Sequence, residues 1–263
     1  MQPGPAIGML FALFAILVGN VLEGGHLRSI LGGPAALIVV GGTIGAVMVQ
    51  YPIPTLIAAV KAAGGTFKKP TQDGHKLIEE IVDYANRARR DGILALEKVT
   101  ASASDPFLAK ALTMAIDGAD STTLRQTMEI AITMQEEHGE DGAKAFEAAG
   151  GYSPTVGIIG AVLGLIHVMS NLSDIAAVGE GIAGAFVATI YGVAVANIIF
   201  LPLGGRIKLR LREEITMKEL TLVGVLAIQE GMNPKLVRER LSEFVHEPGG
   251  KKSAGGEPAK ATA

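Results

Sequence analysis

Four long stretches of the chain are almost purely apolar, and they alternate with charged segments. They cover residues 3–22, 29–60, 148–173 and 181–205, and His167 is the only Asp, Glu, Lys, Arg or His among them. A helix needs about 20 mostly apolar residues to cross the hydrocarbon core of a membrane. We therefore predict four transmembrane helices, the second of them confined to about residues 34–51.

The positive charges indicate the orientation of these helices. Residues 53–150 contain 11 Lys and Arg, and the segment from residue 206 onward contains another 11, so 22 of the 23 lie on one side of the predicted membrane. Cytoplasmic loops are the ones that accumulate Lys and Arg. Both termini and the segment between the second and third spans are therefore expected in the cytoplasm.

The segment between the second and third spans is predicted to be helical. Apolar spacing and helix-start signals predict helices at four places, which are residues 55–63, 73–90, 106–116 and 121–138. Asp105 is predicted to be the N-cap of the helix over residues 106–116, because proline is common at the first helical position and Pro106 follows it. Gly118 is expected to end this helix. The Gly-, Pro-, Lys- and Ala-rich chain beyond about residue 247 is expected to be disordered.

The predicted fold is an all-α integral membrane protein, with four transmembrane helices and a helical cytoplasmic domain between spans two and three. We divide it into transmembrane helices one and two, the cytoplasmic domain, transmembrane helices three and four, and a C-terminal helix with a tail. The boundaries are residues 1–52, 53–150, 151–205 and 206–263.

The types of side chain present in the sequence exclude several functions. The absence of cysteine excludes disulfides, thiol catalysis and Cys-based metal sites, and the net charge of −3 does not favour a nucleic acid partner. Spans three and four contain costly polar groups but no carboxylate; these are Ser153, Thr155, His167, Thr189, Tyr191 and Asn197. An ion-conducting role would therefore need a carboxylate from a partner. The alternatives are a membrane enzyme, which lacks a nucleophile–base or acid pair here, and a plain scaffold.

Several of these residues have structural interpretations as well as functional ones. The Thr189 hydroxyl can bind a carbonyl one turn earlier, and His167 can be a packed interfacial residue instead of a proton relay. Pro154 and Pro202 each remove a backbone donor, so they either end the spans or act as hinges at the two ends of a pore-lining helix pair.

The sequence resembles a known family at several places. Residues 152–167, YSPTVGIIGAVLGLIH, resemble span three of the MotA/PomA flagellar stator family, and residues 181–192, GIAGAFVATIYG, resemble its span four. Three shorter stretches also match, at residues 88–97, 146–151 and 230–234. The order and spacing of the motifs make the resemblance specific, and it covers about residues 4–244.

The resemblance implies a stator subunit of the bacterial flagellar motor in the cell inner membrane. Members of the family form a ring of five subunits around two copies of a MotB-like, single-span, peptidoglycan-binding partner. That partner supplies the ion-binding aspartate, and the cytoplasmic part pushes on the rotor protein FliG. A TolQ/ExbB-like energiser of an outer-membrane system is the alternative, although those relatives have three spans.

The resemblance also implies roles for individual residues. Pro154 and Pro202 match two conformationally important prolines of the family. Arg89 and Glu97 match a charged pair that contacts the rotor, and the adjacent Arg90 is expected to share that role.

The expected coupling ion is the proton, and no cofactor is implied. Thr189 is expected to line the ion path beside the aspartate of the partner. Sodium-driven relatives tend to have threonine where this chain has Ala161 and Ala188. Since sodium needs several oxygen ligands at once, the two methyl groups favour the proton.

Overall fold

The computed structural model describes residues 4–68 and 73–245, and its regular elements are all helical. Within these residues, four helices are long and apolar enough to span a membrane, which confirms the predicted fold class. The disordered tail predicted beyond residue 247 lies outside the described residues.

The chain divides into two compact units. The first combines Met1–Thr71 with Ala131–Ile215, and the second combines Gln72–Ile130 with Thr216–Ala263. Two long helical runs contribute to both units, so the units do not coincide with the four segments of the predicted division. Each unit is described by itself below.

In the first unit, the spans are formed by four helical runs. The N-terminal run is α1, Gly4–Leu22, followed by the short η1, Leu27–Ile30. The second run joins α2, Gly33–Ala36, the π-helix η2, Leu37–Gly41, and α3, Gly42–Gln50. Pro52 then precedes α4, Ile53–Gly65, the predicted short helix.

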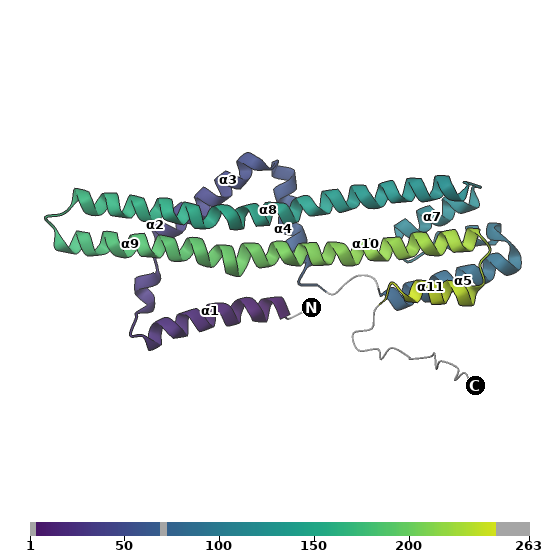
Figure 1. Ribbon diagram of the computed structural model, residues 1–263, viewed down its shortest axis with the longest axis horizontal. Coiled ribbons are helices and arrows are strands. Elements are labelled where there is room, and N and C mark those ends of the chain that lie inside the picture. The colour runs from purple at the N-terminus through teal and green to yellow at the C-terminus, as the bar shows by residue number, and fades with distance from the viewer. Residues whose placement is uncertain (1–3, 69–72, 246–263) are drawn as a thin grey trace, which may run out of the picture. The chain divides into compact units, whose positions relative to one another are not determined.

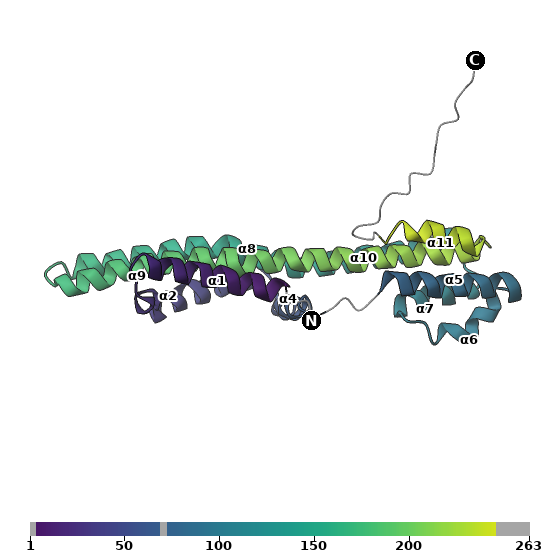
Figure 2. The same ribbon diagram turned by 90° about the horizontal axis from the view of Figure 1, so that it is seen from below.

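The third and fourth runs form an antiparallel pair whose helices lie side by side (Figure 1, Figure 2). The third is α8, Ser121–Ser170, and the fourth joins α9, Ile175–Ala194, the π-helix η4, Val195–Phe200, and α10, Leu201–Gln229. The second run packs against this pair through Ala35 and Val39 on Val187 and Ala188.

The structure corrects one sequence interpretation. Residues 121–138 and 148–173 were predicted as separate helices, yet α8 runs unbroken through the glycines between them. Those glycines serve close packing: a Cβ on Gly139 would lie 2.5 Å from Leu211, and one on Gly142 would lie 3.4 Å from the Ala59 Cα. Glycine costs only about 1 kcal/mol in a helix, which neighbouring contacts can offset.

The second unit contains the remaining helices (Figure 2). They are α5, Gly74–Asp91, η3, Ile93–Leu96, α6, Glu97–Thr100, α7, Pro106–Ile116, and α11, Pro234–Ser242. The side chain of Asp105 caps α7 by accepting from the Phe107 amide, as the sequence predicted. Gly118 has a φ of 85° just beyond the end of α7, the left-handed conformation that glycine adopts at low cost.

Candidate functional site

The contact between α8 and α9 is built from glycines. A Cβ on Gly157 would lie 2.9 Å from the Ala188 carbonyl oxygen, and one on Gly192 would lie 2.7 Å from the Ser153 carbonyl oxygen. Further along, a Cβ on Gly164 would lie 3.0 Å from the Gly181 carbonyl oxygen. Small residues let backbones approach closely inside a membrane, and here they bring spans three and four into backbone contact.

The two predicted ion-path residues flank this contact at one level. A Cβ on Gly160 would lie 2.8 Å from the Ala188 Cβ. Ala161 follows Gly160 and Thr189 follows Ala188, and both are half-buried. The structure therefore brings Ala161 and Thr189 to the same height on neighbouring helices.

The hydroxyl of Thr189 donates to the carbonyl oxygen of Ala185, 3.2 Å away. This is the one-turn bond that sequence reasoning gave as the structural interpretation. A donating hydroxyl still has lone pairs on its oxygen, so the bond orients the Thr189 oxygen without removing it as an acceptor. His167 lies apart from this level, with an exposed side chain near the end of α8.

Pro154 lies inside α8 and does not end it. The preceding residue, Ser153, is buried and donates its hydroxyl to the Gly192 carbonyl oxygen at 3.0 Å. Because proline has no N–H, the α8 ladder loses one hydrogen bond at this position. The helix is thus weakened at a position where its backbone is in contact with that of α9.

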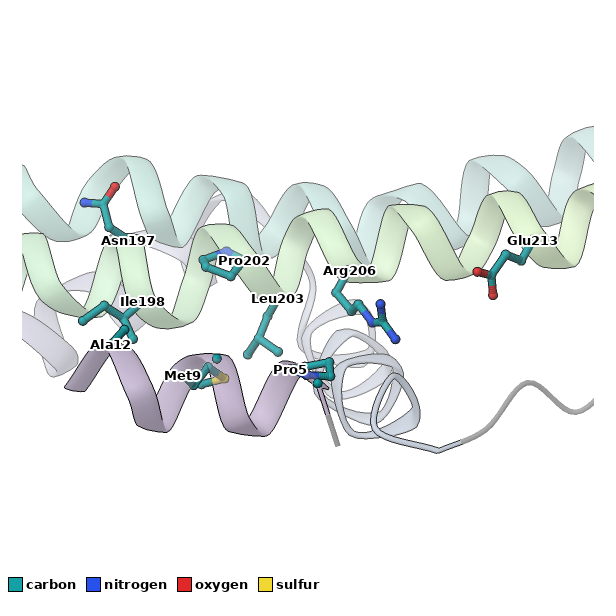
Figure 3. Close-up of a pocket in the computed structure, with 11 residues that line it drawn as sticks. Pro5, Met9, Ala12, Asn197, Ile198, Pro202, Leu203, Arg206 and Glu213 are labelled. Carbon is teal, nitrogen blue, oxygen red and sulfur yellow. The ribbon is translucent and has the colours of Figure 1, made fainter. Parts of the chain in front are cut away.

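Pro202 follows directly after the π-helix η4, in the first turn of α10. Single π-helical turns and prolines both interrupt regular helix hydrogen bonding. Pro202 lines an open groove of about 800 Å³ together with Ile198, Leu203 and residues of α1 (Figure 3). The fourth span is therefore irregular at its junction with α10.

A residue without a predicted role, Tyr191, ties two spans together. Its hydroxyl donates to the Ile30 carbonyl oxygen at 2.7 Å and accepts from the Gly32 amide at 3.2 Å. These bonds fix the entry to the second span against α9, two residues from Thr189. In the sequence, a tyrosine inside an apolar span is only a weak signal, because its partners lie about 160 residues away.

We expect Tyr191→Phe to lower the stability of the assembled protein by roughly 1 kcal/mol, a typical value for a side-chain hydrogen bond within a membrane. Thermal melting of the detergent-solubilised complex measures this. Tyr152→Phe is the matched control, since the Tyr152 hydroxyl bonds only the exposed Gln50 side chain, at 3.1 Å. Equal melting of both variants and wild type would contradict a structural role for Tyr191.

The apolar ranges predicted as spans three and four, residues 148–173 and 181–205, contain no carboxylate. Asp174 lies just before α9, where it caps the helix by accepting from the Ala176 and Ala177 amides, and Glu180 is exposed near the same end. In the described part of the chain, no group of three or more His, Cys, Asp or Glu could hold a metal ion.

The predicted rotor-contact residues lie in the second unit, around the turn after α5. Arg89 and Arg90 occupy the last turn of α5, Gly92 reverses the chain with a φ of 83°, and Glu97 begins α6. All three charged side chains are exposed. Among residues 4–68 and 73–245, no ion pair joins either arginine to Glu97.

The arginines of this turn differ in their partners. Arg87 binds Asp83 at 2.8 Å, and Arg90 binds Asp91 at 3.0 Å. The hydrogen bond to Asp91 also raises the pKa of Arg90. Arg89 has no carboxylate at ion-pair distance in the described chain. The structure therefore distinguishes Arg89 from Arg90 by its lack of an ion pair, a difference that the sequence does not reveal.

Two family profiles match consecutive parts of the chain. Residues 6–92 match the profile described as Motility protein A N-terminal, and residues 99–220 match that of the MotA/TolQ/ExbB proton channel family. The Motility protein A of Bacillus subtilis is 34% identical over 93% of this chain and 91% of its own length. The chain belongs to the MotA/TolQ/ExbB proton channel family.

Solved structures of the family agree with this assignment. The Campylobacter jejuni MotAB structure matches 95% of this chain and 98% of its own, with a TM-score of 0.90 and 31% identity. The flagellar MotAB stator complex of B. subtilis matches 92% of this chain and 95% of its own, with a TM-score of 0.85 and 33% identity. The N-terminal profile distinguishes the motility branch from TolQ and ExbB. The chain is therefore a MotA-type flagellar stator subunit and not an enzyme.

Proposed function

We propose that this chain couples proton flow across the cell inner membrane to torque on the flagellar rotor, with both termini in the cytoplasm. In this proposal, five copies surround two copies of a MotB-like, single-span, peptidoglycan-binding subunit. The observation that carries it is the nearly full-length match to MotAB structures in a chain without a carboxylate in residues 148–173 and 181–205. The partner supplies the missing aspartate.

The small number of side-chain oxygen atoms near Thr189 supports the proton as the coupling ion. Residues 157–164 of α8 carry no side-chain oxygen, and Thr189 is the only residue with one among residues 185–189 of α9. Ala188 is 1% exposed, and its Cβ lies 2.8 Å from where a Cβ on Gly160 would be. A hard cation is held by several oxygens at once, whereas a proton needs one carboxylate and a path of water or hydroxyl groups to reach it.

In this mechanism, Thr189 orients water or the carboxyl group beside the ion path, and Ala161 leaves space for it. Pro154 and Pro202 let spans three and four change their bend as the aspartate gains and loses its proton. Arg89 and Glu97 transmit the resulting rotation to FliG through exposed charges, while Arg90 is held in part by Asp91.

We expect swimming speed to follow the proton motive force and to ignore sodium. The measurement is the speed of free or tethered cells as external sodium is varied at fixed pH and fixed membrane potential. A protonophore should stop rotation, and an amiloride analogue should not. Speed that follows sodium and is abolished by the amiloride analogue would overturn the proton assignment.

A further inference from the structure

We propose that a pocket beside Arg89 receives an aliphatic side chain from an acidic surface of the rotor protein, so that the stator–rotor contact has an apolar anchor as well as charges. This inference rests on the proposed rotor contact and deepens it. The pocket has a volume of about 300 Å³ and lies between α5, η3, α7 and the end of α10, all within the second compact unit.

Apolar side chains supply six of the nine residues that line the pocket, and Arg89, Gln229 and Gly231 supply the rest. Ala88 and Ile93 line it from the two sides of the turn at Gly92, and Met232 lines it from the segment after α10. All three are half-buried. Its volume is about ten times the roughly 30 Å³ that a water molecule takes in the liquid, so there is room for a branched aliphatic side chain.

Polar groups accompany this apolar lining. Gln229 donates its Nε2 to the Ala119 carbonyl oxygen, while its buried Oε1 accepts no hydrogen bond from the described residues. Gly231 keeps the chain in a left-handed turn, with a φ of 68°, between Gln229 and Met232. The hydrogen bond of Gln229 to the segment after α7 and the turn at Gly231 therefore hold this part of the pocket wall in place.

Charge identifies the occupant. Arg89 lines the pocket and, unlike Arg87 and Arg90, has no carboxylate partner in the described chain. When a side chain of a partner protein fills the pocket, the residues next to that side chain lie beside the Arg89 guanidinium, whose charge no carboxylate of the described chain neutralises. A protein surface with carboxylates flanking one aliphatic side chain satisfies both requirements, because complementary charge sets orientation and burial of an apolar side chain adds affinity.

The test measures the affinity of the full stator complex, in detergent or nanodiscs, for full-length FliG of the same organism. Ala88→Leu fills the pocket but leaves Arg89 and Glu97 unchanged. We expect it to weaken binding about tenfold, the order expected from losing one buried aliphatic side chain. Ala109→Leu is the matched control on α7, because Ala109 does not line the pocket, and it should bind as wild type does.

Two further variants distinguish failure of the pocket proposal from failure of the proposed rotor contact. Met232→Gln keeps a similar length but makes the lining polar, and it should weaken binding severalfold even if Ala88→Leu folds poorly. Arg89→Glu tests the charge. Wild-type affinity for Ala88→Leu and Met232→Gln together with weak binding by Arg89→Glu would overturn the pocket and leave the rotor contact standing. Wild-type affinity for all three would overturn the rotor contact as well.

Accessibility provides an independent readout. The chain contains no cysteine, so Met232→Cys introduces a single thiol at the pocket wall. FliG should slow its labelling by a maleimide several-fold and should not slow labelling of Thr113→Cys, an exposed position on α7. A shift of the Ala88→Leu complex to a smaller assembly would show instead that a neighbouring copy of this chain covers the pocket, and would overturn the proposal.

Discussion

Gly192→Ala is expected to abolish motility and to reduce the amount of assembled complex in the membrane. The added Cβ would lie 2.7 Å from the Ser153 carbonyl oxygen and 3.0 Å from the Gly157 Cα. Both are backbone atoms, so the overlap can be relieved only by separating α8 from α9. Overpacking of this kind costs about 1–3 kcal/mol, and here it also moves Thr189 away from Ala161.

The control for this prediction lies in the same helix. Nothing lies within 4 Å of a Cβ built on Gly179, so Gly179→Ala gains the helix propensity of alanine, about 1 kcal/mol, without a clash. The measurements are gel filtration of the complex from membrane fractions and swimming in soft agar. Gly192→Ala should reduce both assembly and swimming, whereas Gly179→Ala should reduce neither. Normal assembly of Gly192→Ala would show that the close helix contact is not needed.

Pro154→Ala is expected to stop swimming while the complex still assembles. The substitution restores the missing N–H of α8, and alanine is about 3 kcal/mol more favourable than proline in a helix interior. The variant should therefore be at least as stable as the wild type, but α8 would be held in one conformation. Pro202→Ala should act in the same way at the junction between η4 and α10.

Motility must be compared with assembly to test this prediction. The measurements are tethered-cell rotation, the amount of complex in the membrane and its thermal melting. Pro106→Ala is the control, because Pro106 starts α7, where a backbone N–H would have no acceptor within the helix, and it should leave rotation unchanged. Loss of Pro154→Ala from the membrane fraction would indicate a purely structural proline.

The local elements could largely be predicted from the sequence because their signals are local. Uninterrupted apolar length is sufficient to predict a membrane span, and all four predicted spans coincide with long apolar helices. The side chain of Asp105 caps α7 as its position suggested, and the structure adds a cap of α5 by Asp73. The predicted helix over residues 73–90 corresponds to α5, Gly74–Asp91.

One prediction was wrong in a segment that contains glycines. Residues 121–138 and 148–173 were predicted as separate helices, yet Gly139 and Gly142, which lie between them, each face a neighbouring helix inside the continuous α8. Glycine in a helix is destabilising in isolation and becomes acceptable when it permits close packing. Only knowledge of the neighbouring helix distinguishes the two cases.

The sequence by itself determined four apolar spans, the concentration of charge outside them and the absence of a carboxylate from spans three and four. The tertiary structure decided which of these residues meet. It placed Ala161 and Thr189 at one level, joined Tyr191 to Ile30, and left Arg89 unpaired among the described residues beside an apolar pocket. Composition and helix signals act over a few residues, whereas these contacts join positions far apart in the chain, whose proximity only packing defines.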